Sequence, residues 1–157
     1  MSLETIDQLL RTHPFFKDLD PGYLELVAGC GKNMVFETGD YLCREGDPAD
    51  LFFIVRRGRV AIEVHLPARG SLVIDTAGEA DVVGASWLFP PYRWQFDARA
   101  LEPVGVVALD GACLRDKCEE DTRLGYQLMK RFAEILVERL ESARLRLIDL
   151  YGGGRAG

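Results

Sequence analysis

The sequence contains few of the residues from which metal sites and catalytic triads are built. Its 157 residues include two histidines, His13 and His65, so a His-rich metal site is poorly supplied. Ser71 and Ser86 have no His and acid nearby in the pattern of a nucleophilic triad. We therefore predict a protein that is not an enzyme, with no catalytic residue, no bound metal and no cofactor.

Cysteine motifs are also missing. The four cysteines, Cys30, Cys43, Cys113 and Cys118, match neither zinc nor thioredoxin spacing, because Cys113 and Cys118 have four residues between them rather than two. Free cysteines are typically buried, and thiols stay reduced in the cytosol. This pattern predicts a cytoplasmic protein with four buried thiols. A redox sensor or a metal cluster is the less favoured alternative.

Basic residues are outnumbered, and long apolar runs are absent. Nineteen Lys and Arg stand against 25 Asp and Glu, a net charge of −6, which disfavours a nucleic-acid partner because such binding needs a basic face. One small anion remains compatible, since backbone N–H groups and a single Arg can hold it. No apolar run approaches the roughly 18 residues of a membrane helix. The first residues lack the layout of a signal peptide. We expect neither nucleic acid nor membrane as a partner.

The composition, 48% hydrophobic and 28% charged, is that of one globular domain. We assign that domain to residues 1–150. It divides into an N-terminal helical segment (1–32), a β-roll (33–109) and C-terminal helices (110–150). The glycine-rich residues 151–157 are predicted to form a flexible tail.

Eight short apolar runs, separated by turn residues, carry the prediction of the roll. Regular spacing of this kind is typical of a closed barrel or jelly roll. The runs are residues 34–36, 41–43, 51–55, 60–64, 72–74, 82–83, 96–101 and 104–109. The predicted fold is mainly β: an eight-stranded antiparallel β-roll, a jelly-roll-like double-stranded β-helix, flanked by N-terminal helices and a long C-terminal helix.

Helical patterns flank the roll on both sides. Residues 3–13 carry apolar residues at helical spacing, including Leu3. Asp20 and Pro21 are typical of the N-cap and first position of a short helix, which we expect to end near residues 29–31. Residues 110–118 predict another short helix.

The last helix is predicted to begin at a cap on Asp121 or Thr122 and to reach about Leu150. Apolar residues recur along it at intervals of three and four, the heptad period of helices that pack on one another. They include Met129, Phe132, Leu136, Leu140, Ala143 and Leu147. This seam is longer than a roll of this size needs, so we predict that part of it packs on a second copy in a homodimer. Docking of the whole helix on its own roll is the alternative.

Four stretches of the sequence occur in an order and register that we identify with one family. They are residues 13–20 (HPFFKDLD), 39–47 (GDYLCREGD), 51–60 (LFFIVRRGRV) and 78–84 (GEADVVG). Together they resemble the cyclic nucleotide-binding domain family, which includes the catabolite activator proteins and the regulatory subunits of protein kinase A. The resemblance covers residues 13–148 and implies a non-enzymatic sensor of a small molecule. Activator members carry a DNA-binding helix-turn-helix after the long helix, and no basic helix follows Tyr151 here.

The family binds a cyclic phosphate in a cassette, where backbone N–H groups and an Arg hold the phosphate and a Glu holds the ribose hydroxyl. The matching segment here is residues 84–98. Gly84 fits the family pattern, but Ala85 stands at the position of the Glu and Trp94 at that of the Arg. Arg93 lies one residue before the Arg position, and Asp97 stands where the family has Thr or Ser. The resemblance therefore implies the fold more directly than it implies cAMP or cGMP.

A ligand, if it is held by this cassette, is expected at Gly84, Ala85, Ser86, Trp87, Arg93 and Trp94. Five of the fifteen aromatic residues fall between residues 87 and 96. They either fill the roll, or stack on a cyclic nucleotide or another small anionic or aromatic ligand, or anchor a protein partner.

Three functions follow from these alternatives. The first is a sensor whose ligand shifts the cassette and, through it, the long helix. The second is a dimeric protein-interaction adaptor with a self-filled pocket. The third, an enzyme on a cupin-like roll, lacks the His-x-His pair that such enzymes use to hold a metal.

Overall fold

The computed structural model describes residues 5–16 and 18–153, so Leu3 and residues 154–157 of the predicted tail lie outside the described part. Helices α1 (Ile6–Thr12) and α2 (Pro21–Gly29) come first. Thr5 and Gln8 form a capping box that begins α1. Pro21 occupies the first position of α2 as predicted, but the Asp20 side chain makes no capping hydrogen bond. Its carboxylate lies 3.3 Å from Arg123 instead.

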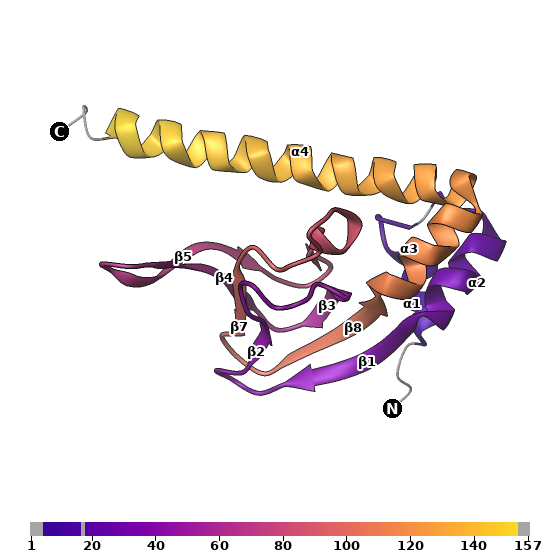
Figure 1. The fold of residues 1–157 in the computed structure, drawn as a ribbon. Coiled ribbons are helices and arrows are strands. Elements are labelled where there is room, and N and C mark those ends of the chain that lie inside the picture. The colour runs from indigo at the N-terminus through magenta and orange to yellow at the C-terminus, as the bar shows by residue number, and fades with distance from the viewer. Residues whose placement is uncertain (1–4, 17, 154–157) are drawn as a thin grey trace.

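Eight strands follow and form two four-stranded antiparallel sheets, with neighbour orders β1-β8-β3-β6 and β2-β7-β4-β5 (Figure 1). The strands are β1 (Gly31–Phe36), β2 (Tyr41–Cys43), β3 (Leu51–Arg57), β4 (Val60–Leu66), β5 (Gly70–Ala77), β6 (Val82–Val83), β7 (Asp97–Ala100) and β8 (Val104–Asp110). One turn of 3-10 helix, η1 (Ser86–Leu88), lies between β6 and β7. Each strand overlaps one of the eight predicted runs, so the predicted fold class is confirmed.

Strand β3 is buried on both faces and separates two hydrophobic cores. Phe52 and Ile54 face a core between the sheets and the helices, whereas Phe53 and Val55 face a core inside the roll. Alternate residues of a strand point to opposite faces, so an uninterrupted apolar run is what a strand covered on both sides requires. The chain therefore has two distinct interiors into which the aromatic residues of the cassette can turn.

Helix α3 (Gly111–Glu120) leads from β8 to the long helix α4 (Thr122–Gly153). The Asp121 carboxylate accepts hydrogen bonds from the amides of Arg123 and Leu124, so it caps α4 as predicted. Helix α4 crosses above the roll and its far end overhangs the β4–β5 hairpin (Figure 1). The helix continues to Gly153, so residues 151–153 of the predicted tail are its last residues.

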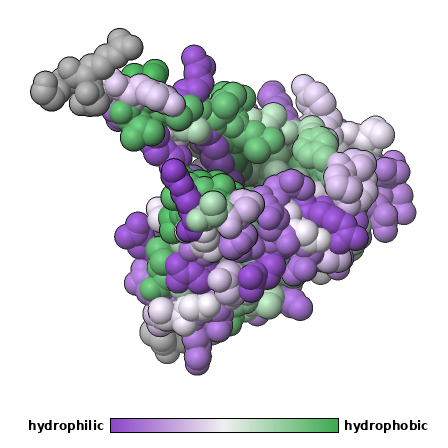
Figure 2. Space-filling view, turned by 60° about the vertical axis from the view of Figure 1, so that its left-hand side comes forward, coloured by the Kyte–Doolittle hydropathy of each residue, from purple (hydrophilic) through white to green (hydrophobic). Residues whose placement is uncertain are grey.

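The predicted seam of α4 is divided between the domain's own core and the surface. Phe132 is 1% exposed and contacts Phe15 and Phe52, so its assignment to a dimer face is wrong. Leu140 is 60% exposed, and the other seam residues, Met129, Leu136, Ala143 and Leu147, are exposed as well. Figure 2 shows hydrophobic side chains on the outer half of α4 and a hollow between that half and the roll.

Candidate functional site

The cassette, residues 84–98, runs from the end of β6 into the first residues of β7, and hydrogen bonds fix it to the loop after β2. The Gly46 amide donates to the Trp94 carbonyl (2.8 Å) and the Trp94 amide to the Asp47 carbonyl (3.0 Å). The Ala49 amide donates to the Tyr92 carbonyl (2.7 Å). Tyr92 has a φ of 56°, a left-handed conformation that turns the chain there. The cassette is therefore held by backbone hydrogen bonds at this turn and just after it.

Trp94 lies inside the roll. Its ring is stacked on Phe53, with centroids 6.0 Å apart and planes 13° apart, and meets Phe96 edge-on at 5.8 Å. Gly84 has a φ of +106°, and a Cβ built on it would lie 2.6 Å from the Trp94 ring. Glycine is thus required at position 84 by the backbone conformation and by the indole. The side chain at the family's Arg position fills space that the roll encloses.

Trp87 turns the other way, into the core beneath the helices. Its indole is stacked on Phe52 (5.0 Å, 11°) and meets Phe132 of α4 edge-on at 5.4 Å. A Cβ on Gly111 would lie 2.7 Å from the Trp87 Cβ, and Arg115 Nη1 donates to the Trp87 carbonyl at 2.6 Å. Trp87 and Trp94, which the sequence grouped at one site, therefore lie in different cores. Trp87 links the cassette to α3 and α4.

The remaining candidates, Ala85, Ser86 and Arg93, come together at the surface. They line a recess of about 300 Å³, together with Phe89, Pro90, Pro91, Gln95 and Leu136. Arg93 Nη1 donates to the Gly46 carbonyl at 2.8 Å, which positions the guanidinium at the rim. Leu136 belongs to α4, so this recess joins the cassette directly to the long helix. It offers one cation, one hydroxyl and an apolar wall.

Asp97 has a local structural partner. Its carboxylate accepts the Glu45 amide at 2.7 Å and lies 3.7 Å from Arg44 Nε. The side chain is largely buried and ties the start of β7 to the loop after β2. An acid at this position therefore stabilises the loop that holds the cassette.

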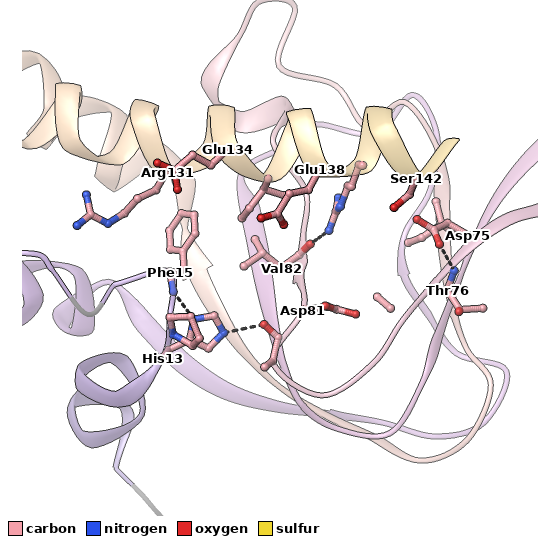
Figure 3. Close-up of a pocket in the computed structure, with 16 residues that line it drawn as sticks. His13, Phe15, Asp75, Thr76, Asp81, Val82, Arg131, Glu134, Glu138 and Ser142 are labelled. Atoms are coloured by element: carbon pink, nitrogen blue, oxygen red, sulfur yellow. Dashed lines mark hydrogen bonds between the residues drawn. The ribbon is translucent and has the colours of Figure 1, made fainter. Parts of the chain in front are cut away.

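A larger groove, of about 560 Å³, lies between α4 and the roll on the β6 side of the cassette (Figure 3). His13 closes one end: its Nε2 lies 2.6 Å from the Ala80 carbonyl, and its Nδ1 accepts the Phe15 amide at 3.1 Å. These partners require the neutral ring with the proton on Nε2. Arg139 reaches under the helix and donates to the Val82 carbonyl. Burial lowers the pKa of the Arg139 guanidinium from its usual value.

Charged residues of both signs line this groove, and the sequence analysis missed it. They are Asp75, Asp81, Glu134, Glu138, Arg131 and Arg139. The signal was present in α4: residues 131, 135, 138 and 142, all of which line the groove, recur at intervals of four, three and four, which places them on one helical face. Hydrophobic periodicity does not detect this stripe, because three of its four residues are charged or polar and an apolar seam lies beside it.

Among the described residues, no group of three or more His, Cys, Asp and Glu side chains is placed to hold a metal ion. Within that same part of the chain, no helix has the length and apolar character needed to cross a membrane. Cys43 is buried, and burial raises the pKa of its thiol to about 12. Cys30, Cys113 and Cys118 are half-buried, so the expectation of four buried thiols is wrong for these three.

Comparison with known proteins gives consistent matches. The family model described as "Cyclic nucleotide-binding domain" matches residues 33–121. The CRP-like cAMP-activated global transcriptional regulator of Mycobacterium tuberculosis is 23% identical over 145 residues, which cover 92% of this chain and 63% of that protein. This chain thus spans less than two thirds of the length of that curated relative.

Solved structures share the fold. A protein from Geobacter metallireducens GS-15, provisionally named a cyclic nucleotide-binding protein, is 29% identical with a TM-score of 0.78, and the match covers 85% of this chain and 97% of the other. The regulatory domain of Toxoplasma gondii PKA, crystallised with cAMP, is 20% identical with a TM-score of 0.63. That match covers 72% of this chain and 43% of the other.

Proposed function

This chain belongs to the cyclic nucleotide-binding domain family, and on that premise we propose that it is a regulatory module that senses a small molecule and signals through α4. The Mycobacterium tuberculosis relative is a transcriptional regulator, and the Toxoplasma gondii relative is the regulatory domain of PKA, crystallised with cAMP. The observation that carries the proposal is the contact of the cassette with α4 at two points, through Trp87 on Phe132 and through the recess that Leu136 shares. A ligand in that recess changes the surroundings of α4 directly.

We propose a small aromatic anion, rather than cAMP or cGMP, as the ligand class. Ala85 has no oxygen to accept a hydrogen bond from a ribose hydroxyl, and Trp94 occupies space within the roll. The recess instead combines the Arg93 guanidinium and the Ser86 hydroxyl with the ring of Phe89 and two prolines. This set suits a carboxylate or phosphate attached to a flat apolar group.

The test is a calorimetric titration with cAMP, cGMP and benzoate, the last as a probe of aromatic anions, with tryptophan emission followed in parallel. Arg93→Ala should weaken benzoate binding about tenfold, because it removes one charged hydrogen-bonding group. The matched control is Arg69→Ala, at an exposed arginine in the turn between β4 and β5 that should leave affinity unchanged. Equal benzoate affinity in wild type and Arg93→Ala would remove the recess from the proposal. If cAMP binds with micromolar affinity and Arg93→Ala leaves that affinity unchanged, the nucleotide would occupy the roll in place of the Trp94 side chain.

We further propose that the exposed half of α4 forms a homodimer. Leu140, Leu147, Leu150 and Tyr151 are all more than half exposed, and contiguous apolar surface of this kind marks an interaction site. Leu140→Glu should yield monomers in sedimentation velocity, whereas Glu141→Gln, one position along the same helix, should leave the dimer intact. A dimer that persists in Leu140→Glu contradicts this assignment.

The second candidate function is an adaptor that binds a protein through this dimer and has a self-filled pocket. The packing of Trp94 against Phe53 within the roll favours it. This second function predicts a stable dimer and no detectable binding of cAMP, cGMP or benzoate in the calorimetric titration. A saturable titration with any of the three excludes it.

A further inference from the structure

Two half-buried cysteines from distant parts of the sequence lie in contact at one end of the roll. Cys30 Sγ donates a hydrogen bond to Cys113 Sγ, and the two sulfurs are 3.1 Å apart. A disulfide requires a separation of about 2.05 Å, so the sulfurs need to approach by roughly 1 Å. The proposed function assigns no role to this pair.

The backbone around the pair is fixed by hydrogen bonds, so the contact is built into the fold. Cys30 immediately precedes β1, and its carbonyl accepts the Asp110 amide at 2.9 Å where β8 ends. The Asp110 side chain in turn accepts the Cys113 amide at 2.9 Å and caps α3. One residue, Asp110, thus holds both cysteine backbones. Rotation of the two side chains about their Cα–Cβ bonds is therefore the movement that can close the gap between the sulfurs.

The environment distinguishes the two sulfurs chemically. Burial and the hydrogen bond to Cys113 raise the pKa of the Cys30 thiol, and Cys30 is the donor in that hydrogen bond. Cys113 is the acceptor and lies in the first turn of α3, a ten-residue helix whose N-terminal amides favour negative charge. The thiolate is the reactive form of cysteine, so Cys113 is the sulfur suited to attack an oxidant.

We propose that Cys30 and Cys113 form a reversible disulfide when the protein meets a peroxide. The Cys113 thiolate attacks one peroxide oxygen, the O–O bond breaks, and hydroxide departs. Cys113 is thereby oxidised to a sulfenic acid. The Cys30 sulfur then displaces the sulfenic oxygen as water while its proton is lost. In sum, two thiols and one hydrogen peroxide give one disulfide and two waters. A dithiol reductant reverses the reaction by thiol–disulfide exchange.

The bond would fasten α3 at the place where the cassette contacts it. Gly111, two residues before Cys113, lies so close to Trp87 that an added Cβ would be 2.7 Å from the Trp87 Cβ, and Arg115, two residues after Cys113, donates to the Trp87 carbonyl. A disulfide at Cys113 therefore fixes the first turn of α3 to the end of α2 beneath the cassette. Oxidation is expected to stabilise this corner of the domain, whatever ligand the recess takes.

The sequence allows the linkage to be identified without ambiguity. Trypsin places each cysteine in a separate peptide: residues 18–32, 33–44, 100–115 and 118–123. The reduced wild-type protein is treated with a small excess of hydrogen peroxide, alkylated, digested without reduction and analysed by mass spectrometry. We expect peptide 18–32 joined to peptide 100–115, the number of titratable thiols falling from four to two, and restoration of four by dithiothreitol.

The matched control is Cys118→Ala, which removes a half-buried thiol from the same helix but outside the pair. It should form the linkage as the wild type does, whereas Cys30→Ala and Cys113→Ala should not. The oxidised wild type should melt about 5–15 °C higher than the reduced form, as expected for a disulfide that closes a long loop. Four free thiols after treatment, a linkage through Cys43 or Cys118, or a bond between two molecules would overturn the proposal. An unchanged melting temperature would overturn the claim that oxidation stabilises this corner.

Discussion

Trp94→Ala tests whether the roll is filled by its own side chain. The indole is buried, stacks on Phe53 and leaves no room for a Cβ at Gly84. Removing a buried aromatic side chain costs about 3–5 kcal/mol, the sum of lost burial and the cavity left behind. Domains of this size are stable by roughly 5–15 kcal/mol, so the variant should remain folded but lose a large share of that stability. Urea denaturation followed by circular dichroism measures the difference.

The matched control is Phe89→Ala in the same cassette. Phe89 is 47% exposed, so its removal should change the free energy of unfolding by less than about 1 kcal/mol. The cavity in Trp94→Ala is apolar, and indole should enter it and raise the melting temperature, because a ligand that binds only the folded state stabilises it. A loss below about 1 kcal/mol in Trp94→Ala would refute the assignment. A full loss without rescue by indole would mean that the cassette collapses into the space.

Two further predictions concern the packing and the hydrogen bonding at the two ends of α3. Gly111→Ala should destabilise the domain by about 1–3 kcal/mol in urea denaturation, because its Cβ would lie 2.7 Å from the Trp87 Cβ. Gly22→Ala in α2 meets nothing within 4 Å and should be neutral or stabilising by up to about 1 kcal/mol, and equal effects of the two would contradict this packing. The Tyr23 hydroxyl donates to Asp121 at 2.8 Å and lowers the pKa of that carboxyl. The contribution of the Asp121 carboxylate to stability is therefore complete above the pKa that the group has in the unfolded chain, near 3.9. It is lost as the pH falls through the lower pKa that the group has in the folded protein. Comparison of urea midpoints at pH 7 and pH 3 should show a smaller loss in Asp121→Asn than in wild type, and parallel losses would contradict it.

The roll was predictable because its signals are local. Alternating apolar residues and turn residues identify each strand within a few positions, and β2 was predicted with its observed bounds. Strand β5 is longer than its predicted run, residues 72–74, because the polar and small residues on either side of the run also pair with β4. A pattern of hydrophobicity identifies the apolar residues of a strand, whether buried or exposed, and it misses the polar and small residues that extend the pairing.

The cassette was less predictable because it has no repeating geometry. The sequence indicated that aromatic residues gather there, but the direction of each side chain depends on the 3-10 turn at Ser86–Leu88 and on the left-handed residue Tyr92. Those two features send Trp87 into one core and Trp94 into the other. Neither core belongs to the cassette alone, so the choice is settled by Phe52 and Phe53, more than thirty residues earlier in the chain.

Leu136 is the residue at which the two parts of the proposed function meet. It lines the recess with Ser86 and Arg93, and it also belongs to the exposed seam of α4. A ligand in the recess and a second copy on the seam would therefore both contact the Leu136 side chain. Coupling between two such binding events is reciprocal, because a ligand that changes dimer affinity must itself bind the dimer and the monomer differently. On the proposed arrangement the signal would need no long path through the roll, because one turn of α4 would connect the cassette with the second copy.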